Sequence, residues 1–212
     1  MNMLERIEEC GVVAAIRADS SERLIDVAKA LEAGGCKFIE VTMSTPNALK
    51  VIEALADTMG DRIGVGVGTV LDPETARAAI LAGAEYIVAP TLRLSVIEMA
   101  KRYSKLAFPG AFTPSEILTA WEAGADMVKV FPAARLGAKY TKDIHGPLPQ
   151  IKIMPTGGID IDNCGEYIKN GASAITAASC IAPRKDIADG NWDKISSLAS
   201  QMIGNIKAAR GL

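Results

Sequence analysis

One phrase recurs along this chain: a helical stretch, a stop at small residues that include glycine, and a short apolar run. Glycine suits the position after the last helical turn, where φ is positive. The run that follows is rich in apolar and β-branched residues, which is typical of a parallel strand buried on both faces. The copies are Leu31–Gly35 before Phe38–Val41, Leu81–Ala84 before Tyr86–Ala89, Glu122–Ala125 before Met127–Val130, and Lys169–Ala172 before Ala174–Thr176.

Helix starts carry their own signals, because capping residues are followed by proline or glutamate at Asp19–Glu22, Asp72–Glu74 and Thr113–Glu116. Strands are predicted near residues 12–17, 38–42, 63–69, 86–89, 107–110, 127–130, 153–156 and 174–177. Helices are predicted near residues 20–33, 47–59, 73–82, 95–103, 114–123, 137–144, 162–170 and 192–209.

Eight strand–helix units in this length predict an α/β protein, a (β/α)8 TIM barrel forming a single domain over residues 1–212. A doubly wound sheet is the structural alternative. It lacks support because no Gly-x-Gly-x-x-Gly lies between a strand and a helix, and Gly64–Gly68 is a strand of spaced glycines.

Composition excludes several classes of function. The net charge is −2 without a basic block, and aromatic residues are few, so nothing indicates nucleic acid or a membrane surface. The one histidine, His145, excludes a zinc site built on several histidines. The cysteines show no metal or disulfide spacing and are interpreted as small buried thiols in a reducing compartment. Without a signal peptide or a membrane-length apolar run, we expect a soluble cytoplasmic protein.

Lys129 is the most informative candidate for chemistry. It lies in the apolar run Met127–Pro132, which reads as a strand. Burial disfavours the ammonium form, and a free amine can attack a carbonyl and form a Schiff base. The alternative is a lysine whose stem is buried and whose ammonium reaches solvent at a strand edge.

Glu40 is the candidate partner of Lys129. Side chains alternate along a strand, so an inward Lys129 leaves Val128 and Val130 to face the helices. An inward Glu40 likewise leaves aliphatic side chains on the helix side of its strand. The strands of Glu40 and Lys129 are both even-numbered, and alternate strands of a barrel share interior layers, so the two groups are expected at similar depth. A proton shuttle beside an imine-forming lysine is favoured over a plain buried ion pair.

Other polar or small residues stand where predicted strands end, and barrel enzymes place their active sites there. The candidates for substrate binding are Arg17, Thr69, Pro90, Phe131, Thr156, Gly157, Gly158 and Ser179. The glycine pair after the seventh strand can hold an anion on its N–H groups, or can simply form a tight turn. Lys37 and Lys152 come at strand starts and are expected as solvated charges on the opposite face.

These residues and their neighbours resemble a known family. Ile39–Thr42, Gly66–Leu71, Val88–Pro90, Pro109–Gly110, Val128–Ala133 and Pro155–Ile159 match, in order, motifs of the class I 2-keto-3-deoxy-6-phosphogluconate (KDPG) and 4-hydroxy-2-oxoglutarate (KHG) aldolases. The resemblance implies a homotrimer of TIM barrels that needs no metal or cofactor. It also implies a small-molecule substrate, a 2-keto acid cleaved to pyruvate and an aldehyde.

The resemblance also implies a role for most candidates. Lys129 would form the Schiff base, Glu40 would act as general acid and base, Thr69 and Thr156 would contact the pyruvyl part, and Gly157, Gly158 and Ser179 would hold a distal phosphate. The aldehyde product would be glyceraldehyde 3-phosphate or glyoxylate.

Two departures from the family pattern matter. Many members carry an arginine for the substrate carboxylate where this chain has Ser44, and Arg17 is the replacement candidate. Members commonly show Gly-Gly-Ser after the eighth strand, where this chain has Ala177-Ala178-Ser179. Alanine crowds a close approach of the backbone to a phosphate, so a carboxylate-ended substrate or another 2-keto-3-deoxy sugar acid is an alternative.

Two rival functions remain open at this point. One is a phosphate-binding barrel isomerase or decarboxylase that uses Lys129 and Glu40 as plain acid and base. A related alternative is oxaloacetate decarboxylation through the same imine. The other is a non-enzymatic ligand-binding barrel, which the burial of two charged groups disfavours.

Overall fold

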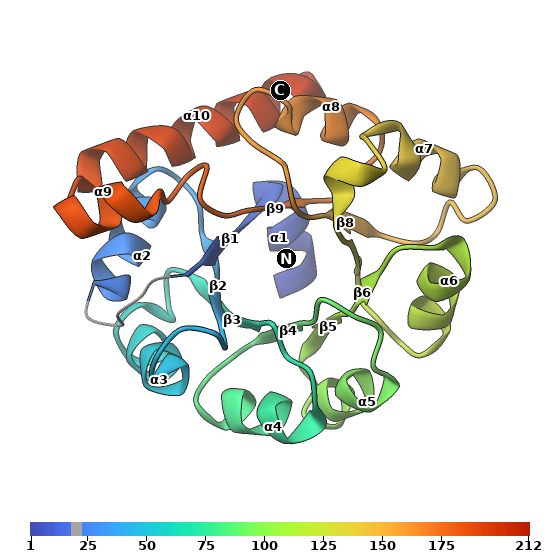
Figure 1. Cartoon of the computed structure of the whole chain (residues 1–212), viewed down its shortest axis with the longest axis horizontal. Helices are drawn as coiled ribbons and strands as arrows, with labels where there is room; N and C mark the ends of the chain where they lie inside the picture. Colours follow the sequence, from blue (N-terminus) through green and yellow to red (C-terminus); the bar gives the residue numbers. More distant parts are fainter. Residues whose placement is uncertain (18–22) are drawn as a thin grey trace.

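The structure is a computed structural model that describes residues 1–17 and 23–212 of the chain. Strands and helices alternate along the described part (Figure 1). The strands are β1 (Val12–Ile16), β2 (Phe38–Thr42), β3 (Gly64–Gly68), β4 (Tyr86–Val88), β5 (Leu106–Phe108), β6 (Gly110–Ala111), β7 (Val128–Val130), β8 (Ile153–Pro155) and β9 (Ile175–Ala177). The helices are α1 (Met3–Cys10), α2 (Leu24–Ala33), α3 (Ala48–Met59), α4 (Pro73–Leu81), α5 (Leu94–Arg102), α6 (Pro114–Glu122), α7 (Lys139–His145), α8 (Cys164–Lys169), α9 (Arg184–Asp189) and α10 (Trp192–Arg210), with the 3-10 helix η1 (Ala133–Arg135).

The strands are parallel and form a curled sheet with helices outside it (Figure 1). One hydrogen-bonded sheet has the order β5-β4-β3-β2-β1-β9, and a second has the order β6-β7-β8. A parallel bridge between Thr156 and Thr176 connects the end of β8 to β9. On the other side, the N–H of Lys129 donates to the carbonyl of Pro109 at 2.9 Å. The predicted α/β class is confirmed, and the curl differs from the open sheet of the doubly wound alternative.

The predicted strand 107–110 is two strands, because Pro109 stands between β5 and β6 and has no N–H to donate to a neighbour. The other predicted strands lie where expected, within about two residues at their ends.

Side-chain alternation divides the core into an inner and an outer part. Phe38 packs in an inner cluster with residues such as Tyr86 and Met127, whereas Ile39 and Val41 pack against the helices. Val128 and Val130 likewise belong to an outer cluster, which confirms the predicted alternation around Lys129. The inner cluster also takes in Ile7 of α1, which Figure 1 draws within the curl of strands. Helix α1 therefore covers the amino end of the inner core.

The spaced glycines of β3 make room for large side chains from neighbouring strands. A Cβ at Gly64 would lie 2.7 Å from the Phe38 ring, and one at Gly66 would lie 2.0 Å from the Tyr86 ring. A Cβ at Gly68 would lie 1.7 Å from Oε1 of Glu40. The inward face of β3 thus carries no side chains, and this absence lets its neighbours fill the interior.

Two of the three predicted helix caps lie within the described residues and are confirmed. The Asp72 side chain accepts from the N–H of Thr75 at 2.6 Å, and Thr113 forms a capping box with Glu116. The third, Asp19–Glu22, extends outside the described residues. The predicted stops are also confirmed, because the recurring phrases end on glycines with positive φ: Gly35 (92°), Gly83 (108°), Gly124 (94°) and Gly171 (98°).

The sequence analysis missed α1, η1 and α9. The capping box of Asn2 and Glu5, which starts α1, was a readable signal. Helix α9 is only six residues long, too short for a periodic pattern. Two further expectations hold only in part. Lys152 directly precedes β8 and is partly exposed, as expected, but it forms an ion pair with Glu8. Cys36 and Cys164 are buried, as expected, whereas Cys10 and Cys180 are only partly buried.

Candidate active site

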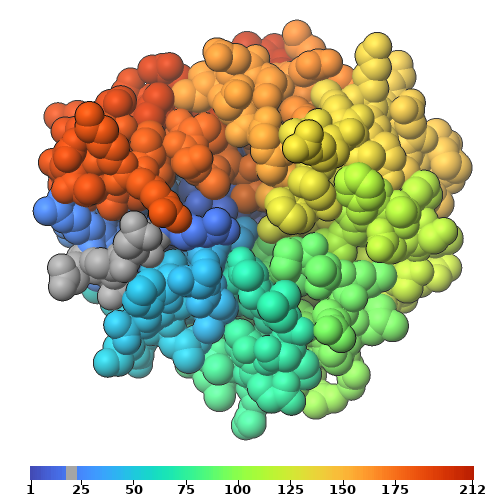
Figure 2. Space-filling view, viewed as in Figure 1, coloured from blue at the N-terminus to red at the C-terminus, as the bar shows by residue number. Residues whose placement is uncertain are grey.

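A cavity of about 580 Å³ opens at the carboxyl ends of the strands. This volume falls in the range of roughly 300–1,000 Å³ that is typical of small-molecule sites. Figure 2 shows this face of the molecule, with successive segments arranged in colour order around its centre. All of the residues that the sequence proposed for catalysis or substrate binding line it, namely Arg17, Glu40, Thr69, Pro90, Lys129, Phe131, Thr156, Gly157, Gly158 and Ser179.

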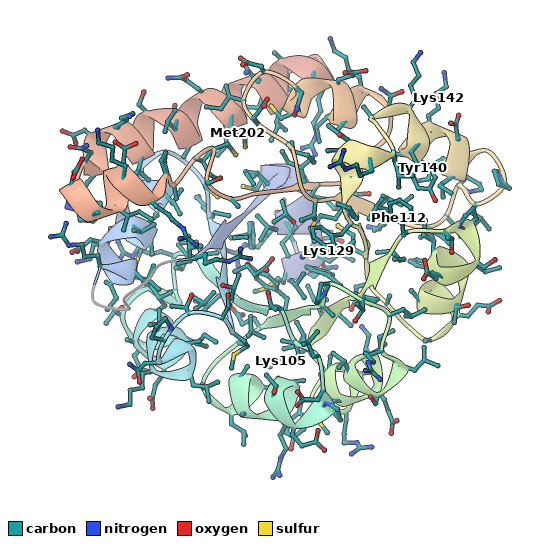
Figure 3. The ribbon with its side chains drawn as sticks, in the orientation of Figure 1. Lys105, Phe112, Lys129, Tyr140, Lys142 and Met202 are labelled. Atoms are coloured by element: carbon teal, nitrogen blue, oxygen red, sulfur yellow. The ribbon has the colours of Figure 1, made fainter. Side chains whose placement is uncertain are left out.

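Lys129 is the middle residue of β7 and is 7% exposed. Its neighbours Val128 and Val130 pack outward, so the alternation of the strand directs the Lys129 side chain into the cavity. Figure 3 shows Lys129 within the curl of strands and Lys142 on the outer surface. The Lys129 Nζ lies 5.5 Å from the centroid of the Phe131 ring. Among the described residues no side chain forms a hydrogen bond or an ion pair with Nζ, so apart from the Phe131 ring the amine faces the open cavity.

Glu40 is the middle residue of β2 and is 1% exposed. Burial is the largest influence on this carboxyl and raises its pKa, while the positive charges of Lys129 and Arg17 lower it in part. Its Oε2 atom is buried and has no hydrogen-bond partner among the described residues. A carboxyl with a raised pKa and a free oxygen, facing the same cavity as an amine, can donate and accept protons there.

Arg17 directly follows β1 and lines the cavity, whereas Ser44 does not. The Ser44 hydroxyl lies 3.0 Å from the hydroxyl of Thr42, so it is held within the loop after β2. Arg17 is therefore a cationic side chain of the cavity wall, and Ser44 is not part of that wall.

The end of the cavity near β8 combines two glycines with an acidic side chain. Gly157 and Gly158 have φ of 93° and 76°, and a Cβ at Gly158 would lie 2.4 Å from the Cβ of Ala134. Asp160 also lines the cavity, and its Oδ1 accepts from the N–H groups of Asp162 and Asn163, both at 3.0 Å. The Asp160 carboxylate thus accepts from the backbone N–H groups that precede α8. These groups are close in sequence to Gly157 and Gly158, which were predicted to bind a phosphate.

Thr69 adopts a backbone conformation that is unusual for its type. Its φ is 62°, in the left-handed region that β-branched side chains rarely adopt. The next residue, Val70, donates to the carbonyl of Val88 at 3.2 Å, which ties this turn to β4. Such strain concentrates at functional sites, and here it sets the Thr69 side chain in the cavity wall.

The cavity also contains residues that the sequence analysis did not choose for catalysis or substrate binding. Thr42, Thr176, Asp160 and Cys180 are the polar ones. Thr176 is 3% exposed, and its Oγ1 has no partner among the described residues. Alternation in the predicted strand 174–177 was a readable signal, because outward Ile175 and Ala177 leave Thr176 facing inward. No comparable signal marked Asp160, whose place depends on the turn after β8.

Comparison with known proteins identifies the family. The sequence model of the KDPG and KHG aldolases matches residues 3–198 of the chain. This chain belongs to the KDPG and KHG aldolase family.

The relatives cover nearly the whole chain. The chain is 32% identical to the 2-dehydro-3-deoxy-phosphogluconate aldolase of Dickeya dadantii, over 93% of this chain and 92% of that one. It is 33% identical to the KHG/KDPG aldolase of Escherichia coli K12, over 92% of each chain. The resemblance seen in the sequence is confirmed, and this family member is an aldolase, a carbon–carbon lyase.

Solved structures show the same fold. KDPG aldolase from Legionella pneumophila, with pyruvate captured as a covalent carbinolamine, superposes with a TM-score of 0.87 at 29% identity and covers 95% of this chain and 98% of that one. A designed cube-shaped protein cage, made by fusing symmetric oligomeric domains, matches with a TM-score of 0.87 at 28% identity and covers 95% of this chain and 73% of that one.

In residues 1–17 and 23–212 no cluster of three or more His, Cys, Asp or Glu side chains is arranged to hold a metal ion. His145 is remote from the cavity and contacts the carbonyl of Ile151 at 2.9 Å. None of the helices in this part of the chain has both the length and the apolar character needed to span a membrane.

Proposed function

We propose that this aldolase cleaves a 2-keto-3-deoxy acid through a Schiff base on Lys129, with Glu40 as general acid and base. One observation carries the proposal: the amine of Lys129 and the carboxyl of Glu40 are both buried, and both face the same cavity. The substrates are KDPG, which gives pyruvate and glyceraldehyde 3-phosphate, and 4-hydroxy-2-oxoglutarate, which gives pyruvate and glyoxylate. The names of the relatives support this substrate class.

The reaction begins at the 2-keto carbon. The Lys129 amine attacks this carbon to form a carbinolamine, and Glu40 in its acid form donates a proton to the departing hydroxyl. The raised pKa of Glu40 favours the acid form that this step requires. The product is a protonated imine, and Glu40 is left as a carboxylate.

The protonated imine then draws electrons from the bond that breaks. The Glu40 carboxylate takes the proton of the C4 hydroxyl, the C3–C4 bond breaks, and the aldehyde leaves. The enamine that remains on Lys129 is protonated at C3, and hydrolysis of the imine releases pyruvate and restores the amine. Glu40 supplies the proton at C3, so the C4 hydroxyl proton ends in the methyl group of pyruvate. The water lost when the imine forms is regained at hydrolysis, and no other reactant is needed.

The remaining lining residues bind the substrate. Arg17 meets the C1 carboxylate, and a charge-assisted bond of this kind contributes roughly 1.5–3 kcal/mol. Thr69 and Thr156 contact the pyruvyl part. Pro90 and Phe131 form an apolar part of the cavity wall. Gly157, Gly158 and Ser179 bind the end of the substrate that is distant from the 2-keto group.

The proposal includes the architecture around the site. The bridge between Thr156 and Thr176 and the bond from Lys129 N to Pro109 O support closure of the strands into a (β/α)8 barrel over residues 1–212. A homotrimer is supported by the family resemblance and by the symmetric oligomeric domains of the similar designed cage. The four unpaired cysteines support a reducing cytoplasmic location.

Trapping with borohydride tests the proposed function. The protein is incubated with pyruvate and sodium borohydride, and modified peptides are mapped by mass spectrometry. We expect one stable adduct, on Lys129, and none in Lys129→Met, while both proteins keep the same circular dichroism spectrum. If the folded wild type forms no adduct, the Schiff-base mechanism is wrong, and an acid–base reaction without an imine becomes the better account. Pyruvate release from KDPG and from 4-hydroxy-2-oxoglutarate then identifies the aldehyde.

A further inference from the structure

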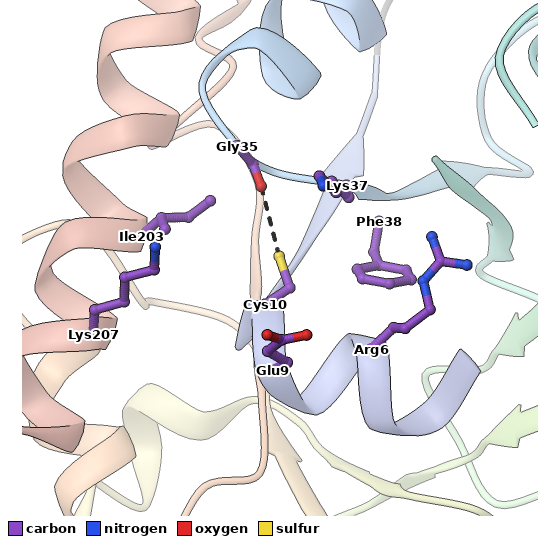
Figure 4. Close-up of a pocket in the computed structure, with 8 residues that line it drawn as sticks. All are labelled: Arg6, Glu9, Cys10, Gly35, Lys37, Phe38, Ile203 and Lys207. Carbon is purple, nitrogen blue, oxygen red and sulfur yellow. Dashed lines mark hydrogen bonds between the residues drawn. The ribbon is translucent and has the colours of Figure 1, made fainter. Parts of the chain in front are cut away.

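A second cavity, of about 330 Å³, lies at the amino ends of β1 and β2, at the opposite end of the strands from the candidate active site. Figure 4 shows the residues that line it: Arg6, Glu9, Cys10, Gly35, Lys37, Phe38, Ile203 and Lys207. The lining includes three cationic side chains and one acidic side chain, so the cavity has a net positive charge. One thiol, that of Cys10, faces into it.

Cys10 has a second thiol beside it. In the parallel pair β1–β2, Ala14 stands opposite Ile39, and the same offset puts Gly11 opposite Cys36. Cys10 is therefore one residue from the position that faces Cys36, and neighbouring strands are about 4.8 Å apart. The Cys10 Sγ lies 3.9 Å from the carbonyl oxygen of Gly35, the residue just before Cys36 (Figure 4). Cys36 belongs to the outer core cluster, and Cys10 packs against that cluster.

The two thiols differ in exposure and in acidity. Cys10 is partly exposed to the cavity, whereas Cys36 is fully buried. The neighbouring Cys36 thiol is the largest influence on the Cys10 pKa and lowers it, while burial raises it. The backbone and the charge of Lys37 lower it further, and the resulting pKa is about 6. The Cys36 pKa is raised well above its usual value, by the interaction with Cys10 and by burial. The two shifts thus favour a thiolate at Cys10, beside the cavity, and a protonated thiol at Cys36, behind it.

The acidity of the other two cysteines can be compared with that of Cys10. Cys164 and Cys180 both have a pKa raised above the usual thiol value, with burial as the largest cause. Reactivity toward oxidants follows the thiolate, so Cys164 and Cys180 should react slowly where Cys10 reacts fast.

We propose that Cys10 and Cys36 form a redox-active dithiol, at which a peroxide converts the pair to a disulfide. The Cys10 thiolate attacks one peroxide oxygen, the O–O bond breaks, and the other oxygen leaves with a proton as water or an alcohol. Cys10 is now a sulfenic acid. The Cys36 sulfur attacks the Cys10 sulfur, the S–O bond breaks, and water leaves with the Cys36 proton. Overall two thiols lose two electrons, and the peroxide gains them.

The position of the pair suits this role. Cys10 ends α1, and Cys36 precedes β2, the strand that carries Glu40. A disulfide would tie α1, which covers the amino end of the inner core, to that strand. Disulfides that form in reducing compartments are usually transient or redox-sensing, and thiol reductants reverse them.

Peroxide titration of the full-length reduced protein tests the proposal. We expect hydrogen peroxide to remove two free thiols per chain, peptide mapping without reduction to find Cys10 linked to Cys36, and dithiothreitol to restore both thiols. In Cys36→Ser, dimedone should label a sulfenic acid on Cys10, because the second thiol is missing. Cys164→Ser is the matched control and should lose the same two thiols as the wild type.

Alkylation of the wild type gives a second measurement that needs no variant. The rate of iodoacetamide reaction at Cys10 should rise with pH around a midpoint near 6, well below that of Cys164. The proposal is overturned if Cys10 and Cys164 oxidise at the same rate, or if Cys10 oxidises and no link to Cys36 forms in the wild type. Thiol state is the readout throughout, so a failed Schiff-base trap would not affect the result.

Discussion

Replacing Gly68 by alanine tests whether the position of the Glu40 carboxylate controls catalysis. The new Cβ would lie 1.7 Å from Oε1 and 2.4 Å from Cδ of Glu40, whereas ordinary contacts begin at 3.4 Å. The carboxylate oxygen must therefore move by about 1.7 Å. The φ of Gly68 is not positive, so the added methyl acts through this contact and not through backbone strain.

The size of the effect follows from the displacement. A misplacement of about 1 Å in a catalytic group can cost on the order of 100-fold in rate. Gly68→Ala should therefore lower kcat for aldol cleavage by about 100-fold or more. The extra methyl in a full interior should also cost about 1–3 kcal/mol of stability. Pyruvate release, coupled to NADH oxidation by lactate dehydrogenase, measures kcat, and thermal unfolding measures stability.

Two other glycines serve as controls for this experiment. Gly66→Ala lies on the same strand, but its Cβ meets the Tyr86 ring at 2.0 Å, so it should lower stability as much and kcat less. Gly204→Ala lies in α10 with nothing within 4 Å, and should raise stability by about 0.5–1 kcal/mol with kcat unchanged. The reasoning is refuted if Gly68→Ala keeps kcat within about threefold of wild type while losing the stability that Gly66→Ala loses.

Three further predictions concern charged groups of the candidate active site. Folding raises the Glu40 pKa, so the native chain holds this proton more tightly than the unfolded chain, and stability falls as pH rises through the folded pKa. As pH rises above the ordinary carboxyl value of 4.5, the melting temperature of Glu40→Gln should therefore increase relative to that of wild type, and a constant difference would contradict the shift. Arg17→Ala should raise the pyruvate KM roughly 10- to 150-fold, from the loss of about 1.5–3 kcal/mol, and an unchanged KM would reject Arg17 as the carboxylate ligand. Asp160→Asn keeps an oxygen for the N–H groups at α8 but removes the charge, so it should raise kcat/KM for KDPG relative to 4-hydroxy-2-oxoglutarate, and an unchanged ratio would show that this charge has no part in selecting the substrate.

The sequence by itself determined the order of most strands and helices, because most of these elements carry local signals. A glycine with positive φ ended the helices, as at Gly35 and Gly83, and capping residues such as Thr113 began them. Alternation along β7 was enough to predict that Lys129 faces inward, since both of its neighbours are valine. Short or irregular elements were missed where the local pattern is too short to be periodic, as in α9.

Only the tertiary structure decided what each inward group meets. The burial that raises the Glu40 pKa comes from its surroundings in the fold, including the empty inner face of β3, which is distant in sequence. Asp160 enters the cavity through the turn after β8, which no periodic pattern predicts. Cys10 and Cys36 have no recognisable spacing, and they become a pair because β1 and β2 lie side by side. Local sequence patterns determine the backbone conformation of a segment and the side of a strand on which a side chain lies. The pKa of a group and the residues that it contacts depend on distances in the folded structure, and the separation of two residues along the chain does not give those distances.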